Sequence, residues 1–99
     1  MITEKRVEQY LVEEVRKLGG HAYKFKSPGQ ISVPDRICVF PSRLVVFVEC
    51  KKPGADPTTS QKEELKKLAG LGQYVAVANS FSEVDRIIED VKAILAFDI

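Results

Sequence analysis

Hydrophobic and polar residues repeat along the chain with two different periods, and these periods predict helices and strands. Three segments carry hydrophobic residues every three to four positions, which is typical of a helix with one buried face. Four shorter segments are rich in Val, Ile and aromatic residues, which favour strands. The expected elements, in chain order, are a helix at 3–18, strands at 21–26, 36–40 and 44–51, a helix from 58 or 60 to about 70, a strand at 74–78 and a helix from 80 or 82 to about 95. The predicted order is therefore α-β-β-β-α-β-α.

The segment 44–48, Leu-Val-Val-Phe-Val, is continuously hydrophobic and indicates a central strand. Strands of this kind lie between helices in α/β proteins, because both of their faces are buried. Pro41-Ser42-Arg43 is short enough to join this strand to the preceding one as a hairpin. We expect an α/β fold with a mixed central sheet flanked by helices on both faces.

Length and composition limit the classes of protein that the chain can belong to. The 99 residues suffice for one hydrophobic core, so we expect a single domain over residues 1–99. Hydrophobic residues make up 44% and charged residues 29%, and no hydrophobic run approaches the roughly 20 residues of a membrane-spanning helix. We expect a cytoplasmic protein, of cellular, phage or prophage origin. The net charge of +1 excludes a strongly basic nucleic-acid coat protein, so any contact with DNA must be local.

The sequence gives little support for metal binding or catalysis by cysteine or histidine. Cys38 and Cys50 have no partner at zinc-binding spacing, and we interpret them as buried free thiols. The single histidine, His21, follows a Gly-Gly helix end and lacks the partners that a histidine-based nucleophile or a zinc site would need. We therefore expect no catalytic role for His21.

Charge interrupts hydrophobicity at the end of the central strand, in Glu49-Cys50-Lys51. Side chains alternate between the faces of a strand, so Glu49 and Lys51 share one face and Cys50 points to the other. Charged groups beside a buried strand are costly unless they are paired or bind a metal. Asp35 begins the neighbouring strand, and a short hairpin can bring it beside Glu49. Two converging carboxylates suit a hard divalent cation such as Mg²⁺, with Lys51 within reach of the substrate phosphate.

The residues Pro34-Asp35 and Glu49-Cys50-Lys51 resemble the PD-(D/E)XK signature of restriction-endonuclease-like nucleases. A wider set of residues is similar to the virus-type replication-repair nuclease family, VRR-NUC. This set comprises a glutamate in the first helix, Gly19-Gly20, Ser27-Pro28-Gly29, Val33-Pro34-Asp35-Arg36, Val48-Glu49-Cys50-Lys51 and Gln61. The resemblance extends from Glu8 to about Ala78 and implies a restriction-endonuclease-like core.

The resemblance also implies a DNA endonuclease that hydrolyses phosphodiester bonds with Mg²⁺ or Mn²⁺. In this interpretation Asp35, Glu49 and the Cys50 backbone carbonyl bind the metal, and Lys51 activates water or stabilises the phosphorus centre. Glu8 would complete the acidic cluster, directly or through water, and Gln61 would support it from the second helix. Stand-alone members of the family resemble Holliday-junction resolvases and act as homodimers, whereas members embedded in larger repair proteins cut flaps as monomers. We expect a homodimer that cuts branched DNA such as four-way junctions.

Other interpretations stay open on the residues alone. The helical spacing that favours Glu8 does not cleanly exclude Glu4 or Glu14, and Gln61 can equally form a capping box with Thr58. The whole chain can also be interpreted as a non-catalytic module that binds branched DNA, or as a flap-cutting or restriction-type nuclease.

Basic and aromatic residues close to the motif in sequence are candidates for contacts with DNA. Four cations can neutralise phosphates there, namely Lys26, Arg36, Arg43 and Lys52. Tyr23 and Phe25 alternate with lysines and could stack on bases, although a strand with one core face and one solvated face explains the same pattern. Gln30-Ile31-Ser32 stands where many relatives carry basic residues and a glycine, so we expect different loop contacts to DNA.

Overall fold

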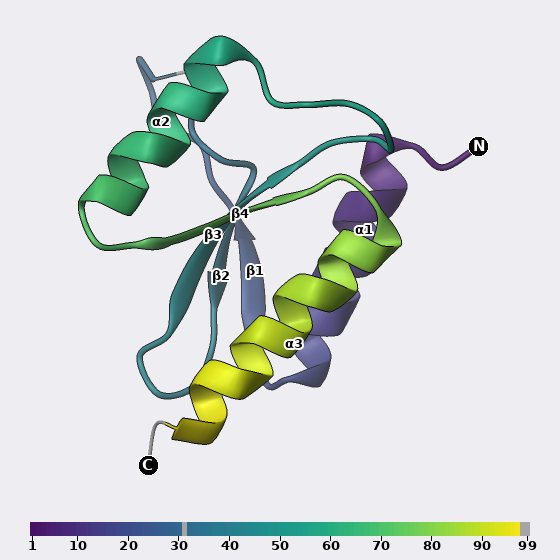
Figure 1. The fold of residues 1–99 in the computed structure, drawn as a ribbon, viewed down its shortest axis with the longest axis vertical. Helices are drawn as coiled ribbons and strands as arrows, with labels where there is room; N and C mark the ends of the chain where they lie inside the picture. Colours follow the sequence, from purple (N-terminus) through teal and green to yellow (C-terminus); the bar gives the residue numbers. More distant parts are fainter. Residues whose placement is uncertain (31, 98–99) are drawn as a thin grey trace.

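A computed structural model describes residues 1–30 and 32–97, and its helices and strands follow the predicted order (Figure 1). Ile31, within the Gln30-Ile31-Ser32 segment, and residues 98–99 lie outside the described residues. The elements are α1 (Glu4–Lys17), β1 (His21–Lys24), β2 (Arg36–Val39), β3 (Val45–Cys50), α2 (Thr59–Gly70), β4 (Tyr74–Ala78) and α3 (Phe81–Phe97). The predicted order is confirmed, and β1 ends two residues earlier than expected.

Helix α1 has sharp signals at both ends and one buried face. At its start, the Thr3 hydroxyl accepts a hydrogen bond of 3.2 Å from a backbone N–H in the first turn. At its end, Gly19 takes the left-handed conformation with φ 80°, and the next amide, that of Gly20, bonds back to the helix. The buried face carries three residues at helical spacing, Val7, Leu11 and Val15.

Helix α3 buries Val84, Ile87, Ile88 and Val91 against the same core as α1. The two helices therefore hold one layer of the molecule together through hydrophobic contacts. Among the described helices, none combines the length and the hydrophobicity that crossing a bilayer requires.

The four strands form a mixed sheet in the order β1-β2-β3-β4. The β1–β2 and β2–β3 pairs are antiparallel, and β4 lies parallel to β3 after the α2 crossover. Ser42 and Arg43 both have φ of 64°, as in the type I′ turns that join two-residue hairpins. The predicted hairpin and the mixed sheet are both confirmed.

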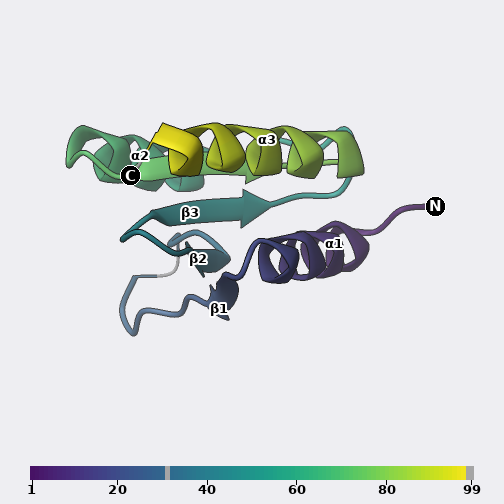
Figure 2. The same cartoon turned by 90° about the horizontal axis from the view of Figure 1, so that it is seen from below.

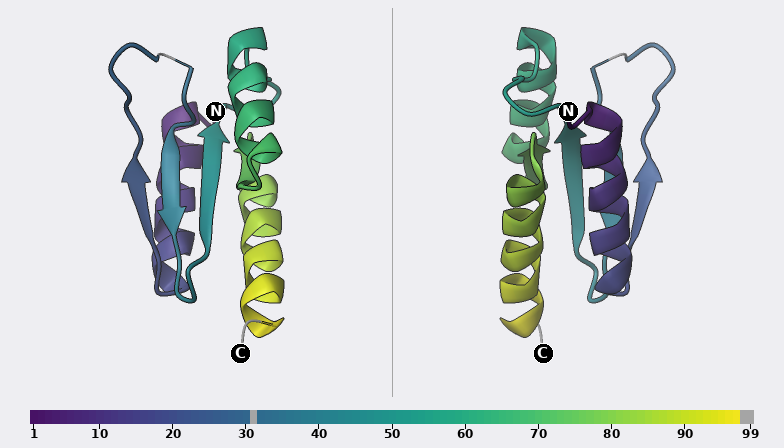
Figure 3. Two further views of the ribbon diagram at one scale, coloured as in Figure 1. Left: turned by 90° about the vertical axis from the view of Figure 1, so that its left-hand side faces the viewer. Right: turned by 90° about the vertical axis from the view of Figure 1, so that its right-hand side faces the viewer.

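Helices flank the sheet on both faces, as predicted, but they cover the two faces unequally. On one face, α1 and α3 pack over residues from all four strands. On the other face, α2 packs against β4. Figure 3 shows β1, β2 and β3 in front of α1 with no helix in front of them, and in Figure 2 only the loop after β1 lies on that side. Tyr23 and Val39 consequently stay 54% and 38% exposed, so β1 and β2 each have one core face and one solvated face, which is the simpler explanation of the alternation at Tyr23 and Phe25.

Candidate active site

The adjoining ends of β2 and β3 bring two acidic side chains together. Arg36 pairs with Val48 across the antiparallel strands, so the preceding residue, Asp35, lies opposite Glu49. The Asp35 Oδ2 atom accepts a hydrogen bond of 2.8 Å from the backbone N–H of Cys50. This bond holds the Asp35 carboxylate against the end of β3, next to Glu49.

Glu49 is a carboxylate with only 2% of its surface exposed. Burial, together with the charge of Asp35 and a hydrogen-bond contact with it, raises the pKa of Glu49 to about 7. The Lys51 ammonium lies 3.5 Å from Glu49 Oε2 and offsets part of this effect. The other oxygen, Oε1, is buried without a hydrogen-bond partner in the described part of the chain. Because such an atom is costly to bury, the site favours an additional positive or hydrogen-donating group.

The donor set at this position suits a hard divalent cation. Carboxylate oxygens are ligands that Mg²⁺ prefers, and a cation would offset the repulsion between Asp35 and Glu49. Within residues 1–30 and 32–97, no group of three or more His, Cys, Asp or Glu side chains is arranged to hold a metal ion. The side chains thus supply two carboxylates, and further ligands would have to be backbone carbonyls, water or substrate.

Glu8 does not join this pair of carboxylates. Its Oε2 atom lies 2.7 Å from Nε of Arg36 and 3.3 Å from Nζ of Lys24. Arg36 alternates with Asp35 along β2 and therefore faces α1, on the other side of the sheet from Glu49. Glu8 is held on that side by a strong charge-assisted bond, and α1 is thereby attached to the first two strands.

Gln61 forms a capping box with Thr58 at the start of α2. The Gln61 side-chain oxygen accepts a bond of 2.8 Å from the Thr58 backbone, and the Thr58 hydroxyl accepts one of 3.2 Å from Gln61 N–H. This is the structural alternative that the sequence left open. It fixes the point where the segment after Lys51 enters the helix.

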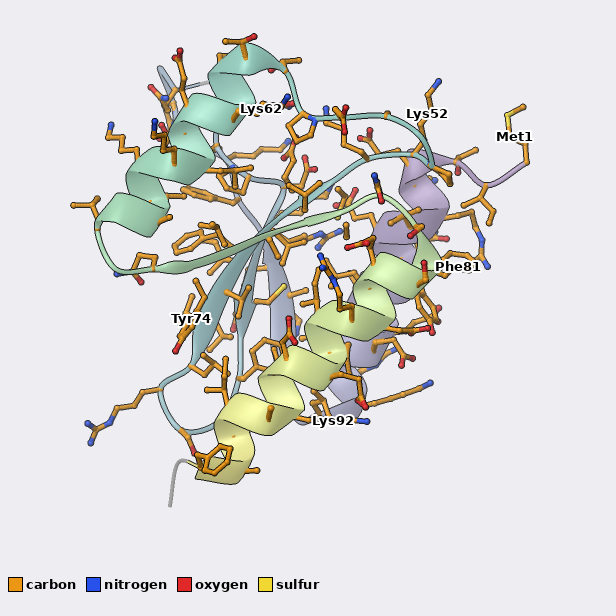
Figure 4. All side chains as sticks on the ribbon, in the orientation of Figure 1. Met1, Lys52, Lys62, Tyr74, Phe81 and Lys92 are labelled. Carbon is orange, nitrogen blue, oxygen red and sulfur yellow. The ribbon has the colours of Figure 1, made fainter. Side chains whose placement is uncertain are left out.

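The four cations predicted to contact DNA occupy different environments. Lys26 and Lys52 are exposed and follow β1 and β3 at the end of the sheet where Asp35 and Glu49 lie. Figure 4 shows Lys52 at the same end of the molecule as Met1. Arg36 is only 16% exposed and donates to Glu8 and to the Ala22 carbonyl, so it is not free on the surface. Arg43 lies in the β2–β3 turn, at the opposite end of β3 from Glu49, and does not flank the carboxylates in space.

A loop before β2 is fastened to α2 by contacts that the sequence did not predict. The Ser32 hydroxyl bonds to that of Ser60 at 2.9 Å, and the Gln30 amide bonds to Glu64 at 3.0 Å. The partners are about 30 positions apart, and Ser and Gln side chains are common in unattached loops. No sequence signal could have paired them, because only the packing of α2 brings them together.

Cys38, Cys50 and His21 show no arrangement suited to chemistry. Both thiols are free and buried, and burial raises the pKa of Cys38 to about 12 and also raises that of Cys50. Thiols of this kind are poor nucleophiles. His21 is exposed and lies with its ring 4.3 Å from that of Tyr23 on the open face of the sheet.

Comparisons with known proteins agree with this fold. No family model matches the chain. The chain is 50% identical over 80 residues to "Putative nuclease p44" of Acyrthosiphon pisum secondary endosymbiont phage 1, an alignment that spans 81% of this chain and 86% of that protein. A solved structure described as "VRR_NUC domain" superposes with a TM-score of 0.84 at 32% identity, covering 90% of this chain and 97% of the other.

The four-stranded mixed sheet with flanking helices and the carboxylate pair at the ends of β2 and β3 define the restriction-endonuclease-like class of α/β proteins. The relative and the solved structure narrow this class further. The chain belongs to the VRR-NUC family.

Proposed function

We propose that this protein is a metal-dependent DNA endonuclease whose reaction centre is the Asp35–Glu49 pair with Lys51. The observation that carries the proposal is the buried Glu49 carboxylate: one of its oxygens has no hydrogen-bond partner within residues 1–30 and 32–97, and its pKa is raised to about 7. An uncompensated buried carboxylate is costly for a protein, and such perturbed groups gather at functional sites. A binding module without catalysis would have no need for this group, because exposed cations suffice to hold DNA.

Asp35, Glu49 and the Cys50 backbone carbonyl would hold Mg²⁺ or Mn²⁺. When bound, such an ion lowers the pKa of water and stabilises charge on the phosphate. The Cys50 N–H keeps the Asp35 carboxylate oriented. Lys51 is 15% exposed beside Glu49 and would donate a hydrogen bond to the attacking water or to a phosphate oxygen.

Glu8 and Gln61 would act on this site indirectly, through other groups. Glu8 is bound to Arg36, the direct neighbour of Asp35, and any link from Glu8 to the ion would run through water. Gln61 would support the site by fixing the first turn of α2 and thereby the segment that follows Lys51. Lys26 and Lys52, both exposed near the carboxylates, would contact phosphates.

The substrate would be branched DNA, and the active form a homodimer that makes two symmetric cuts. A chain of 99 residues offers one Asp35–Glu49 pair, so paired nicks across a junction need a second copy. The molecule exposes Leu71, Tyr74 and Phe97 by 69%, 52% and 87%, at the start of β4 and the end of α3. Exposed hydrophobic side chains near a sheet edge support association.

Removal of single carboxylates tests the nuclease proposal. The variants Asp35→Asn and Glu49→Gln should lose cleavage by about a thousandfold or more, because several kcal/mol of charge stabilisation disappear. Asn at position 35 can still accept the Cys50 N–H bond, and Gln at position 49 removes a buried charge, so both variants should fold. Labelled four-way junction, flap and linear duplex DNA, each with Mg²⁺, Mn²⁺ or EDTA, would show the activity and the preferred substrate.

The exposed carboxylate of Asp56 provides a matched control, because Asp56→Asn changes the same charge in the segment that follows Lys51. This variant should cut at the wild-type rate. Undiminished cleavage by Asp35→Asn or Glu49→Gln, or equal cleavage in EDTA, would contradict the assignment. Binding of junctions without cleavage under every condition would favour the non-catalytic module instead.

A further inference from the structure

A groove of about 520 Å³ runs between α1 and the edge of the sheet, apart from the carboxylate pair. One stripe of α1 forms its wall, and Lys24 of β1 and Arg36 of β2 face it from the sheet. These two residues are paired in the ladder between β1 and β2, so their side chains lie side by side. The groove is therefore built by three elements, and Glu8 of α1 links them through its ion pairs with Arg36 of β2 and Lys24 of β1.

The charge of the groove is positive. Its cations are Lys5, Arg16, Lys24 and Arg36, and its carboxylates are Glu8 and Glu13. Glu8 is already neutralised by Arg36 and Lys24. Positive charge therefore remains available to a ligand, above all at Lys5 and Arg16, which are exposed at the two ends of the helical stripe.

The groove starts at the end of the molecule where the proposed reaction centre lies. Figure 3 shows the arrow of β3 ending beside the first turn of α1. Arg36 in the groove directly follows Asp35 in the chain but faces α1, so the groove and the carboxylate pair share this end of the molecule on opposite faces of the sheet. From Lys5 to Arg16 the helix rises roughly 16 Å at 1.5 Å per residue. Measured along the axis of a DNA duplex, where each strand carries one phosphate per roughly 3.4 Å, this length corresponds to about five phosphates of one strand.

We propose that this groove binds the sugar–phosphate backbone of the DNA arm next to the cleavage point. The inference rests on DNA being the substrate, and it adds a second contact surface to the reaction centre. Lys5 and Arg16 neutralise phosphates at its two ends, and Lys24 does so in the middle while it pairs with Glu8. Contacts of this kind position the substrate without reading its sequence.

Charge reversal at the two ends of the groove tests the proposal. Lys5→Glu and Arg16→Glu, combined in one protein, leave the Glu8–Arg36 bond untouched. The dissociation constant for a labelled four-way junction and for a labelled duplex should rise about tenfold or more. The slope of log Kd against log salt concentration should decrease by the amount that corresponds to about two phosphate contacts. Fluorescence anisotropy in EDTA over a series of KCl concentrations measures both quantities without cleavage.

The matched control reverses the same number of charges elsewhere, with Lys66→Glu on α2 and Lys92→Glu on α3, both exposed. The control should bind within about twofold of the wild type, and Lys5→Arg with Arg16→Lys should bind normally, because phosphate neutralisation needs only the charge. Equal weakening in the groove variant and the control would overturn the proposal, as would unchanged binding by the groove variant. These binding measurements need no catalysis, so failure of the groove proposal can be told apart from failure of the nuclease proposal. The latter would appear as cleavage by Asp35→Asn or Glu49→Gln.

Discussion

At the scale of single residues, Glu49 and Glu8 show how the surroundings decide what a carboxylate does. Glu49 is buried next to another carboxylate, and one of its oxygens has no hydrogen-bond partner among the described residues. Glu8 is a partly buried carboxylate on a helix, and two cations surround it. The first is poised to attract a cation, whereas the second already has its counter-charges and holds α1 against the sheet.

The pKa of Glu49 leads to a prediction about stability and pH. Its pKa is raised from 4.5 to about 7 in the folded chain, so the folded state binds this proton more tightly than the unfolded state. The free energy of unfolding of the metal-free protein should therefore fall as pH rises from 4.5 through about 7. Urea unfolding across this range measures the effect.

Glu49→Gln removes the titrating group and should abolish this part of the pH dependence. Above pH 7, saturating Mg²⁺ should raise the free energy of unfolding of the wild type, because an ion that binds the folded state stabilises that state. The same addition should raise the free energy of unfolding of Glu49→Gln much less. A wild-type stability that is flat, or that rises, over the same pH range would contradict the assigned environment of Glu49.

At the scale of elements, the ends of the helices position the site. The α1 helix ends at Lys17, and Gly19 and Gly20 then turn the chain directly into the edge strand β1. At Gly20 an added Cβ would lie 2.6 Å from the Val39 carbonyl oxygen and 2.9 Å from the Phe40 ring. The backbone between α1 and β1 thus approaches the sheet so closely that only glycine fits at position 20.

The close approach at Gly20 predicts a large loss of stability in Gly20→Ala. Forcing the backbone apart should cost about 1–3 kcal/mol or more of unfolding free energy. Gly70→Ala is the matched control, because nothing lies within 4 Å of its added Cβ and its φ is not positive. That substitution, in the last turn of α2, should stabilise by roughly 0.5–1 kcal/mol. Chemical denaturation of both variants measures the two changes in unfolding free energy. An unchanged stability of Gly20→Ala would contradict a close contact of position 20 with Val39 and Phe40.

At the scale of the whole molecule, the two faces of the sheet differ in the helices that cover them, and its two edges differ in the side chains that they expose. One face lies under α1 and α3, while β1 and β2 are open on the other. Among the described strands, β1 and β4 form the two edges of the sheet. The β1 edge borders the cationic groove, and Tyr74 at the start of β4 projects away from the sheet (Figure 4).

The homodimer proposal predicts a solution mass of about twice 11.1 kDa. Light scattering coupled to size exclusion would measure it, and Asp35→Asn should give the same mass because the reaction centre lies elsewhere. Tyr74→Lys, which adds charge at the exposed β4 edge, should shift the protein toward the monomer. A wild-type mass of one chain at every concentration would contradict a dimer of this protein.

Local patterns in the sequence were enough to predict the elements and the approach of Asp35 to Glu49. Helix and strand periods depend on neighbours a few positions away, so the order of elements could be inferred directly. The approach of Asp35 to Glu49 followed from a short hairpin, whose register forces the start of β2 beside the end of β3. The same hairpin carries Arg43 to the far end of β3, so its nearness to Glu49 along the chain does not become nearness in space.

The tertiary structure alone decided the partners of charged side chains and the shape of the surface. The sequence could not show that Glu8 binds Arg36 or that Gln30 binds Glu64, because long charged and polar side chains can reach many partners. The uneven cover of the sheet and the cationic groove likewise depend on where α1 and α2 lie, which rests on packing between distant segments. Secondary structure and the register of the β2–β3 hairpin are set by short-range geometry, whereas charge pairing and grooves are set by contacts that exist only after the chain has folded.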